Sequence, residues 1–115
     1  MKFFRRKVKR GTQLGRKLGF PTINLNIGEF RDYFRQGVYG CQVCIGNRSY
    51  SGLLYYGPRL IKRGRILEIY IHHFSRALYD QWVRFKVGRF IRGPQKFISP
   101  AALQSQMQKD LKHLA

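Results

Sequence analysis

The sequence predicts a mainly β fold: a small, antiparallel, Greek-key-like closed barrel of about six strands with one C-terminal helix packed on it. Three observations lead to this prediction. Short segments alternate apolar and polar residues, turns that contain glycine separate them, and the last segment changes to helical spacing. Because 115 residues is a usual length for one domain, we expect a single domain over residues 1–115.

The expected strands follow from period-two alternation. It is clearest over residues 22–27, Thr-Ile-Asn-Leu-Asn-Ile, which predicts a half-buried strand with a polar face. Residues 1–7 are a basic extension or a first strand. The turn pair Gly46-Asn47 predicts a hairpin between a strand that ends at residue 45 and a strand that begins at residue 48. The remaining strands are expected over 38–45, 48–55, 66–73 and 82–92.

A helix is expected over residues 99–115. Ser99 is a good N-cap and Pro100 suits the first helical turn. Apolar residues then recur at helical spacing, which predicts that one side of the helix packs against the barrel rather than binding a partner. This stripe consists of Leu103, Met107, Leu111 and Leu114.

The charge of the chain indicates a polyanionic partner. There are 23 Lys and Arg residues against 5 Asp and Glu residues, a formal net charge of +18. Such a balance favours phosphate in some form, either ATP or nucleic acid. A high Lys and Arg content across a whole proteome would produce the same number, so the charge does not choose between these partners.

The residues that often mark metal or redox sites give little signal here. Cys41 and Cys44 lie three apart on an expected strand and so point to opposite faces, and no second cysteine pair completes a zinc site. His72 and His73 are adjacent on another expected strand and are predicted to face opposite ways. Reduced cysteines and the lack of a long apolar run predict a cytoplasmic protein with no membrane partner, and we expect a monomer.

A glycine-rich segment, residues 11–19, is a candidate phosphate loop. Glycines recur every four residues around two cations, so backbone N–H groups could approach phosphates closely while the cations offset their charge. The segment lacks Walker A spacing and precedes a strand, so a flexible turn is the alternative. The candidate phosphate-binding residues are Gly11, Gly15, Arg16, Lys17 and Gly19.

The strand after this loop carries candidate metal ligands. Thr22 and Asn24 are two residues apart, so their side-chain oxygens point to the same side. Such oxygens suit Mg²⁺ when substrate phosphates complete its coordination. The alternative is a polar strand edge facing solvent, and the adjacent glycine loop favours the metal.

These motifs resemble those of riboflavin kinases. Residues 11 and 15–24, read as G-x-x-x-G-R-K-L-G-F-P-T-I-N, are similar to the flavokinase signature G-x-x-x-G-R-x-L-G-F-P-T-A-N, with Ile23 where alanine is usual. The similarity extends in order from about Val8 through the rest of the chain. Its further blocks are Gly37-Val38-Tyr39, 67–71 (Leu-Glu-Ile-Tyr-Ile), Leu78-Tyr79, 90–92 (Phe-Ile-Arg), Lys96-Phe97, and Leu103, Gln106 and Asp110 in the helix.

The resemblance implies a reaction and roles for particular residues. Riboflavin kinases transfer the γ-phosphoryl group of ATP to the ribityl 5′-hydroxyl of riboflavin, giving FMN, with ATP as co-substrate and Mg²⁺ as cofactor. By resemblance, Glu68 is the catalytic base, Thr22 and Asn24 help to bind Mg²⁺, and the glycine loop covers ATP. The family's mobile segment over the flavin ring would correspond to Arg92, Lys96 and Phe97.

Two segments depart from the family pattern. Residues 55–61 read Y-Y-G-P-R-L-I where many bacterial relatives have N-I-G-x-R-P-T, and residues 92–97 read R-G-P-Q-K-F, which lacks the acidic residue of R-x-E-x-x-F. An alternative function is therefore a catalytically degenerate flavokinase-like barrel that binds RNA or a ribonucleoprotein through its basic surface. The retention of Glu68 together with the phosphate loop and Thr22 and Asn24 favours the kinase. A chain of this length is not expected to carry an FMN adenylyltransferase domain as well.

Overall fold

The computed structural model describes residues 3–10, 20–59, 63–74 and 76–114. Its strands are β1 Phe3–Lys7, β2 Thr22–Leu25, β3 Gly37–Ile45, β4 Arg48–Pro58, β5 Arg65–Ile71 and β6 Trp82–Arg92. Its helices are the 3₁₀ helix η1 Gly28–Asp32, the α-helix α2 Pro100–Leu111 and the 3₁₀ helix η2 Lys112–Leu114. The predicted class, six antiparallel strands followed by one C-terminal α-helix, is confirmed. No helix within these ranges combines the length and the apolar character that crossing a bilayer requires.

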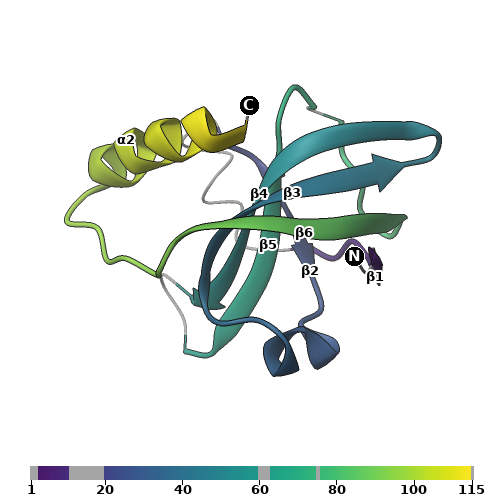
Figure 1. Ribbon diagram of the computed structural model, residues 1–115, viewed down its shortest axis with the longest axis horizontal. Helices are drawn as coiled ribbons and strands as arrows, with labels where there is room; N and C mark the ends of the chain where they lie inside the picture. Colours follow the sequence, from purple (N-terminus) through teal and green to yellow (C-terminus); the bar gives the residue numbers. More distant parts are fainter. Residues whose placement is uncertain (1–2, 11–19, 60–62, 75, 115) are drawn as a thin grey trace.

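The six strands form one curled antiparallel sheet in the order β1-β6-β3-β4-β5-β2 (Figure 1). The two edge strands, β1 and β2, are therefore brought towards each other by the curl. Just beyond β1, the backbone N–H of Lys9 donates to the carbonyl of Asn24 at 2.8 Å, an isolated antiparallel bridge. This bridge joins the two edges and closes the barrel at one level.

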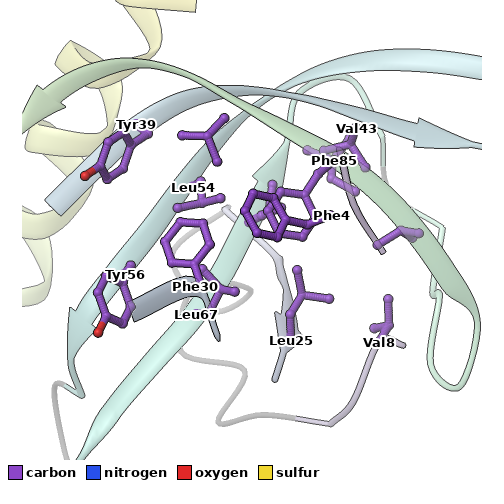
Figure 2. Close-up of a cluster of buried hydrophobic side chains, with 14 of the residues drawn as sticks. Phe4, Val8, Leu25, Phe30, Tyr39, Val43, Leu54, Tyr56, Leu67 and Phe85 are labelled. Atoms are coloured by element: carbon purple, nitrogen blue, oxygen red, sulfur yellow. The ribbon is translucent and has the colours of Figure 1, made fainter. Parts of the chain in front are cut away.

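The core fills the inside of the curl, where every second residue of each strand points. Phe30 of η1 inserts among these side chains and is fully buried, as Figure 2 shows. Its ring lies 5.5 Å from Phe4, 4.5 Å from Phe34, 5.3 Å from Tyr56 and 6.4 Å from Phe85, measured between centroids. The short helix η1 therefore supplies the aromatic centre of the barrel, although the sequence pattern did not predict it.

The predicted hairpin is confirmed, since β3 ends at Ile45 and β4 begins at Arg48. Gly46 in the turn has φ +59°, a conformation that glycine adopts without steric cost. The prediction for the two histidines is wrong. β5 ends at Ile71 and His73 has φ +59°, so the extended backbone has already ended and the rings of His72 and His73 lie 3.8 Å apart.

Helix α2 begins as predicted: the Ser99 hydroxyl accepts a hydrogen bond from the N–H of Ala102 at 3.1 Å. The apolar stripe of the helix is only half-buried and lies outside the main core. The one fully buried residue of α2 is Asp110, which is held by Arg92 at the end of β6. The helix therefore sits on the outer surface at one end of the sheet (Figure 1).

We predict that Phe30→Ala destabilises the protein by about 3–5 kcal/mol, because it removes a large buried ring whose neighbours cannot all close in on the cavity. Chemical denaturation followed by far-UV circular dichroism would measure the change. Ile98→Ala is the control, because Ile98 is 99% exposed and its truncation should change stability by less than about 0.5 kcal/mol. Similar losses in the two variants would contradict the placement of Phe30 at the centre of the core.

Candidate functional site

The outer face of the sheet carries a row of residues that are directly opposite one another on neighbouring strands. Asn24 on β2 is paired with Glu68 on β5, and Glu68 is paired with Tyr55 on β4. Tyr55 is in turn paired with Val38 on β3, and Val38 with Arg92 on β6. Residues opposite each other in a sheet share a face, so the strand pairing alone assembles this row.

The predicted base and a predicted metal ligand are in contact. The Thr22 hydroxyl donates a hydrogen bond to Oε2 of Glu68 at 3.1 Å. Burial raises the pKa of the Glu68 carboxyl, while the Thr22 hydrogen bond and the positive charge of Arg59 lower it. The result is a carboxylate with a pKa above its ordinary value, fixed in position and suited to accepting a proton.

Asn24 presents an oxygen with no partner. The residue is 4% exposed, and its side-chain Oδ1 has no hydrogen-bond partner among the described residues. A buried carbonyl oxygen left unpaired costs free energy, so such an atom points to a ligand. An amide oxygen close to a hydroxyl and a carboxylate fits Mg²⁺, which prefers oxygen ligands. In the described parts of the chain no three His, Cys, Asp or Glu side chains form a metal cluster, so phosphate oxygens would have to complete the shell.

A groove of about 620 Å³ opens beside this row. It lies between the end of β4, the connection that follows β6, and the first turns of α2. Its volume is that of a small-molecule site, and its walls combine apolar rings with a few polar groups. The lining residues are Tyr55, Pro58, Arg59, Leu103 and residues 94–100. Two of the three predicted flavin contacts, Lys96 and Phe97, are among them.

Tyr55 connects the row to the groove, and sequence analysis did not single it out. It is the partner of Glu68 across β4 and β5, and it also lines the groove. Its hydroxyl donates to the carbonyl of Pro58 at 2.7 Å. Burial and the negative charge of Glu68 raise the pKa of Tyr55, while Arg92 lowers it, so the phenol stays protonated. Strand alternation with the register of β5 could have identified this residue.

Arg92 contacts both helix α2 and one of the other predicted flavin contacts: its guanidinium carbon lies 5.7 Å from the centre of the Phe97 ring. Its Nε and Nη2 donate to the carboxylate of Asp110 at 3.0 and 2.9 Å, and its Nη1 donates to the carbonyl of Gly93 at 3.3 Å. Gln106 donates to the same carboxylate at 3.0 Å. Arg92 thus anchors α2 to β6 beside the groove, and its contact with flavin stays a prediction.

The predicted phosphate-binding residues, 11, 15, 16, 17 and 19, lie outside the described residues. The described residues on either side of them are fixed next to the candidate metal ligands. Lys9 is bonded to the backbone of Asn24, and the ring of Phe20 packs on Tyr70 at 5.3 Å, where Tyr70 is the strand partner of Thr22. Lys9 and Phe20, which flank these residues in the sequence, therefore lie close to Thr22 and Asn24.

The two cysteines are free thiols and take no part in this site. Cys41 packs against the core, and burial raises its pKa to about 12, so it stays a neutral thiol at neutral pH. Cys44 is paired with Arg84 on the neighbouring strand. The two side chains lie on opposite faces of β3, as strand alternation predicts.

Comparisons with known proteins agree with this architecture. The family model Flavokinase, described as riboflavin kinase, matches residues 2–115. The RNA-binding riboflavin kinase RibR of Bacillus subtilis is 32% identical over 111 residues, which cover 94% of this chain and 47% of that protein. A bifunctional riboflavin kinase/FMN adenylyltransferase of Mycoplasma pneumoniae is 35% identical over 106 residues, covering 91% of this chain and 38% of the relative. The chain thus spans half or less of the length of these relatives.

Solved structures show the same fold. The riboflavin kinase from Trypanosoma brucei superimposes with a TM-score of 0.67 at 25% identity, covering 97% of this chain and 76% of that one. A protein from Streptococcus pneumoniae described as a macrolide-efflux protein gives a TM-score of 0.81 at 26% identity, covering 97% of this chain and 38% of the other. Since the family model matches nearly every residue, the chain belongs to the riboflavin kinase family.

Proposed function

We propose that this chain transfers the γ-phosphoryl group of ATP to the ribityl 5′-hydroxyl of riboflavin, giving FMN and ADP. The observation that carries this proposal is the position of Glu68. On one side it accepts a hydrogen bond from Thr22 and lies opposite Asn24, whose Oδ1 has no partner. On the other side it lies opposite Tyr55, which lines the groove. A polar, phosphate-compatible region and a small-molecule groove thus meet at one carboxylate.

Glu68 acts as the general base in this proposal. The 5′-hydroxyl oxygen attacks the γ-phosphorus, the new O–P bond forms, and the bond to the β,γ-bridging oxygen breaks, so ADP leaves with the electron pair. The proton of the hydroxyl passes to Glu68. A raised pKa makes the carboxylate a stronger base than an exposed one, and the Thr22 hydrogen bond fixes its orientation.

Thr22 and Asn24 would hold Mg²⁺ together with the nucleotide phosphates. The ion, when bound, neutralises charge that develops on the transferred phosphoryl group. Gly11, Gly15, Arg16, Lys17 and Gly19 are proposed to surround the phosphates. The region around Glu68 fits these roles, because the segments flanking the glycine loop end beside Thr22 and Asn24.

The groove would receive riboflavin. Tyr55 and Phe97 offer aromatic surfaces for the flavin ring, and Arg59 and Lys96 offer hydrogen-bond donors for its carbonyl groups. Arg92 would act on this ligand through the placement of α2 and of the Phe97 ring, since its guanidinium pairs with Asp110 and lies 5.7 Å from that ring. Cytoplasmic location and a monomeric state stay predictions.

The first test is FMN formation from riboflavin, ATP and Mg²⁺, followed by chromatography. Glu68→Gln should lower kcat by roughly 10²- to 10⁴-fold, because it removes the base but keeps an oxygen that accepts from Thr22. Asn24→Ala should raise the Mg²⁺ concentration needed for half-maximal turnover. The glutamine variant should still bind ATP, measured by calorimetry.

Two substitutions outside the site serve as controls for Glu68→Gln and Asn24→Ala, because they remove the same carboxylate charge or the same amide group. Glu29→Gln changes an exposed carboxylate that pairs with Arg6, and Asn47→Ala changes an exposed asparagine in the β3–β4 turn. Both should leave turnover unchanged. Unaltered kcat in Glu68→Gln would remove this residue as the base, and a wild-type chain that forms no FMN with any nucleotide or divalent metal would refute the kinase.

The pH dependence of kcat provides a further prediction. Glu68 accepts a proton only when ionised, so kcat should fall as the pH drops through its pKa. The charge of Arg59 lowers that pKa. Arg59→Met therefore raises it, and the acidic limb of the profile should move to higher pH. Arg63→Met, an exposed cation in the same connection, should leave the limb in place. A limb that moves to lower pH would contradict the assignment.

A further inference from the structure

A second region of the outer face, distant from the groove, carries cations and exposed rings at strand positions, none of which is an acid. We call it the basic strand face. Its cross-strand pairs join β1 and β6, and their side chains point outward because Phe4, Val83 and Phe85 between them are buried. The pairs are Phe3 with Lys86, Arg5 with Arg84, and Lys7 with Trp82. Four cations are thus grouped with two aromatic residues.

The cations of this face have no acidic partner on their own strands. Arg5 lies directly opposite Arg84, an arrangement of like charges that destabilises a sheet. Neither β1 nor β6 contains an Asp or Glu, and the adjacent strand β3 contains none either. Of the five acids in the chain, Glu29 pairs with Arg6 and Asp110 with Arg92. A bound polyanion would relieve this repulsion.

The two rings are exposed at the surface rather than packed into the core. Phe3 is 40% exposed and Trp82 is 52% exposed. The Arg5 guanidinium lies 4.1 Å above the Trp82 ring, and Arg84 and Lys86 lie 5.2 and 5.4 Å from the Phe3 ring. The charges and the rings therefore form one layer. Such a layer suits the stacking of planar groups on the rings. It suits a lipid surface less well, because the rings do not extend past the charges to reach the acyl chains.

We propose that the basic strand face binds single-stranded nucleic acid. Unpaired bases stack on Phe3 and Trp82, or on the adjoining guanidinium planes, and the cations contact the phosphates. A duplex fits less well, because its bases are already stacked on one another. This surface is separate from the groove: Figure 1 shows β1 beside the beginning of β6, away from α2, while Arg92 at the other end of β6 binds the helix.

Fluorescence anisotropy with a labelled oligouridylate of about 20 nucleotides tests the proposal on the 115-residue chain. Trp82→Ala and Phe3→Ala should each weaken binding roughly fivefold or more, because each removes a stacking surface. The double variant Arg84→Gln/Lys86→Gln should weaken binding and reduce the slope of log K against log salt by about 1.4, the value for two phosphate contacts on a single strand.

The matched control is Lys109→Gln/Lys112→Gln, which removes the same charge from exposed positions at the end of α2 and in η2. It should change the affinity much less, since charges more than about 8 Å from the bound strand are screened at physiological salt. Thermal unfolding of each variant would verify folding, and FMN formation by Trp82→Ala should match the wild type.

Several outcomes would overturn the proposal. Equal weakening in the two double variants would show binding by net charge alone. Unchanged affinity in both Trp82→Ala and Phe3→Ala would exclude stacking, and equally tight binding of duplex RNA would exclude selection of single strands. Capture by vesicles containing phosphatidylserine, without binding of the oligouridylate, would identify a membrane surface instead.

Discussion

The register of β5 between β2 and β4 is the constraint on which the candidate site depends. Leu67, Ile69 and Ile71 are buried in the core, and in a strand this placement forces Glu68 to the outer face. The same register sets Glu68 opposite Asn24 on one side and Tyr55 on the other. A slip by one residue would bury the carboxylate in the core. The hydrophobic core therefore fixes the chemistry of the outer face.

The site contains groups that a structure selected for stability alone would not keep. The pKa of Glu68 is raised by burial, so keeping it ionised at neutral pH costs free energy, although Thr22 and Arg59 offset part of that cost. The buried Oδ1 of Asn24 has no partner among the described residues. The proposed function accounts for both unfavourable features, because a cation would satisfy the Asn24 oxygen and a substrate hydroxyl would face the Glu68 carboxylate.

Period-two alternation and turn chemistry were enough to predict most of the fold. They located the β3–β4 hairpin through Gly46 and the start of α2 through Ser99, and resemblance supplied Glu68 and its neighbours. Pattern alone did not reveal η1, because Phe30 is a single buried ring in a short 3₁₀ turn. Nor did it reveal the Arg92–Asp110 ion pair, whose members are 18 residues apart, or the groove, whose walls come from the end of β4 and the segment after β6. Alternation and turn residues are local signals in the sequence, whereas the groove and the ion pair depend on contacts between distant segments.

Alternation along β6 explains how one strand serves two surfaces. Its inward side chains are apolar and continue the core, so all of its cations are placed outward or at its ends. Arg92, at the end, meets Asp110 and anchors the helix that walls the groove. Arg84, near the beginning, meets Arg5 and no acid of β1, β3 or β6. Along β6, the difference between a structural cation and one available to a polyanion therefore lies in whether α2 brings a carboxylate to it. With 23 basic and 5 acidic residues in the chain, the acids are too few to pair with most of the cations.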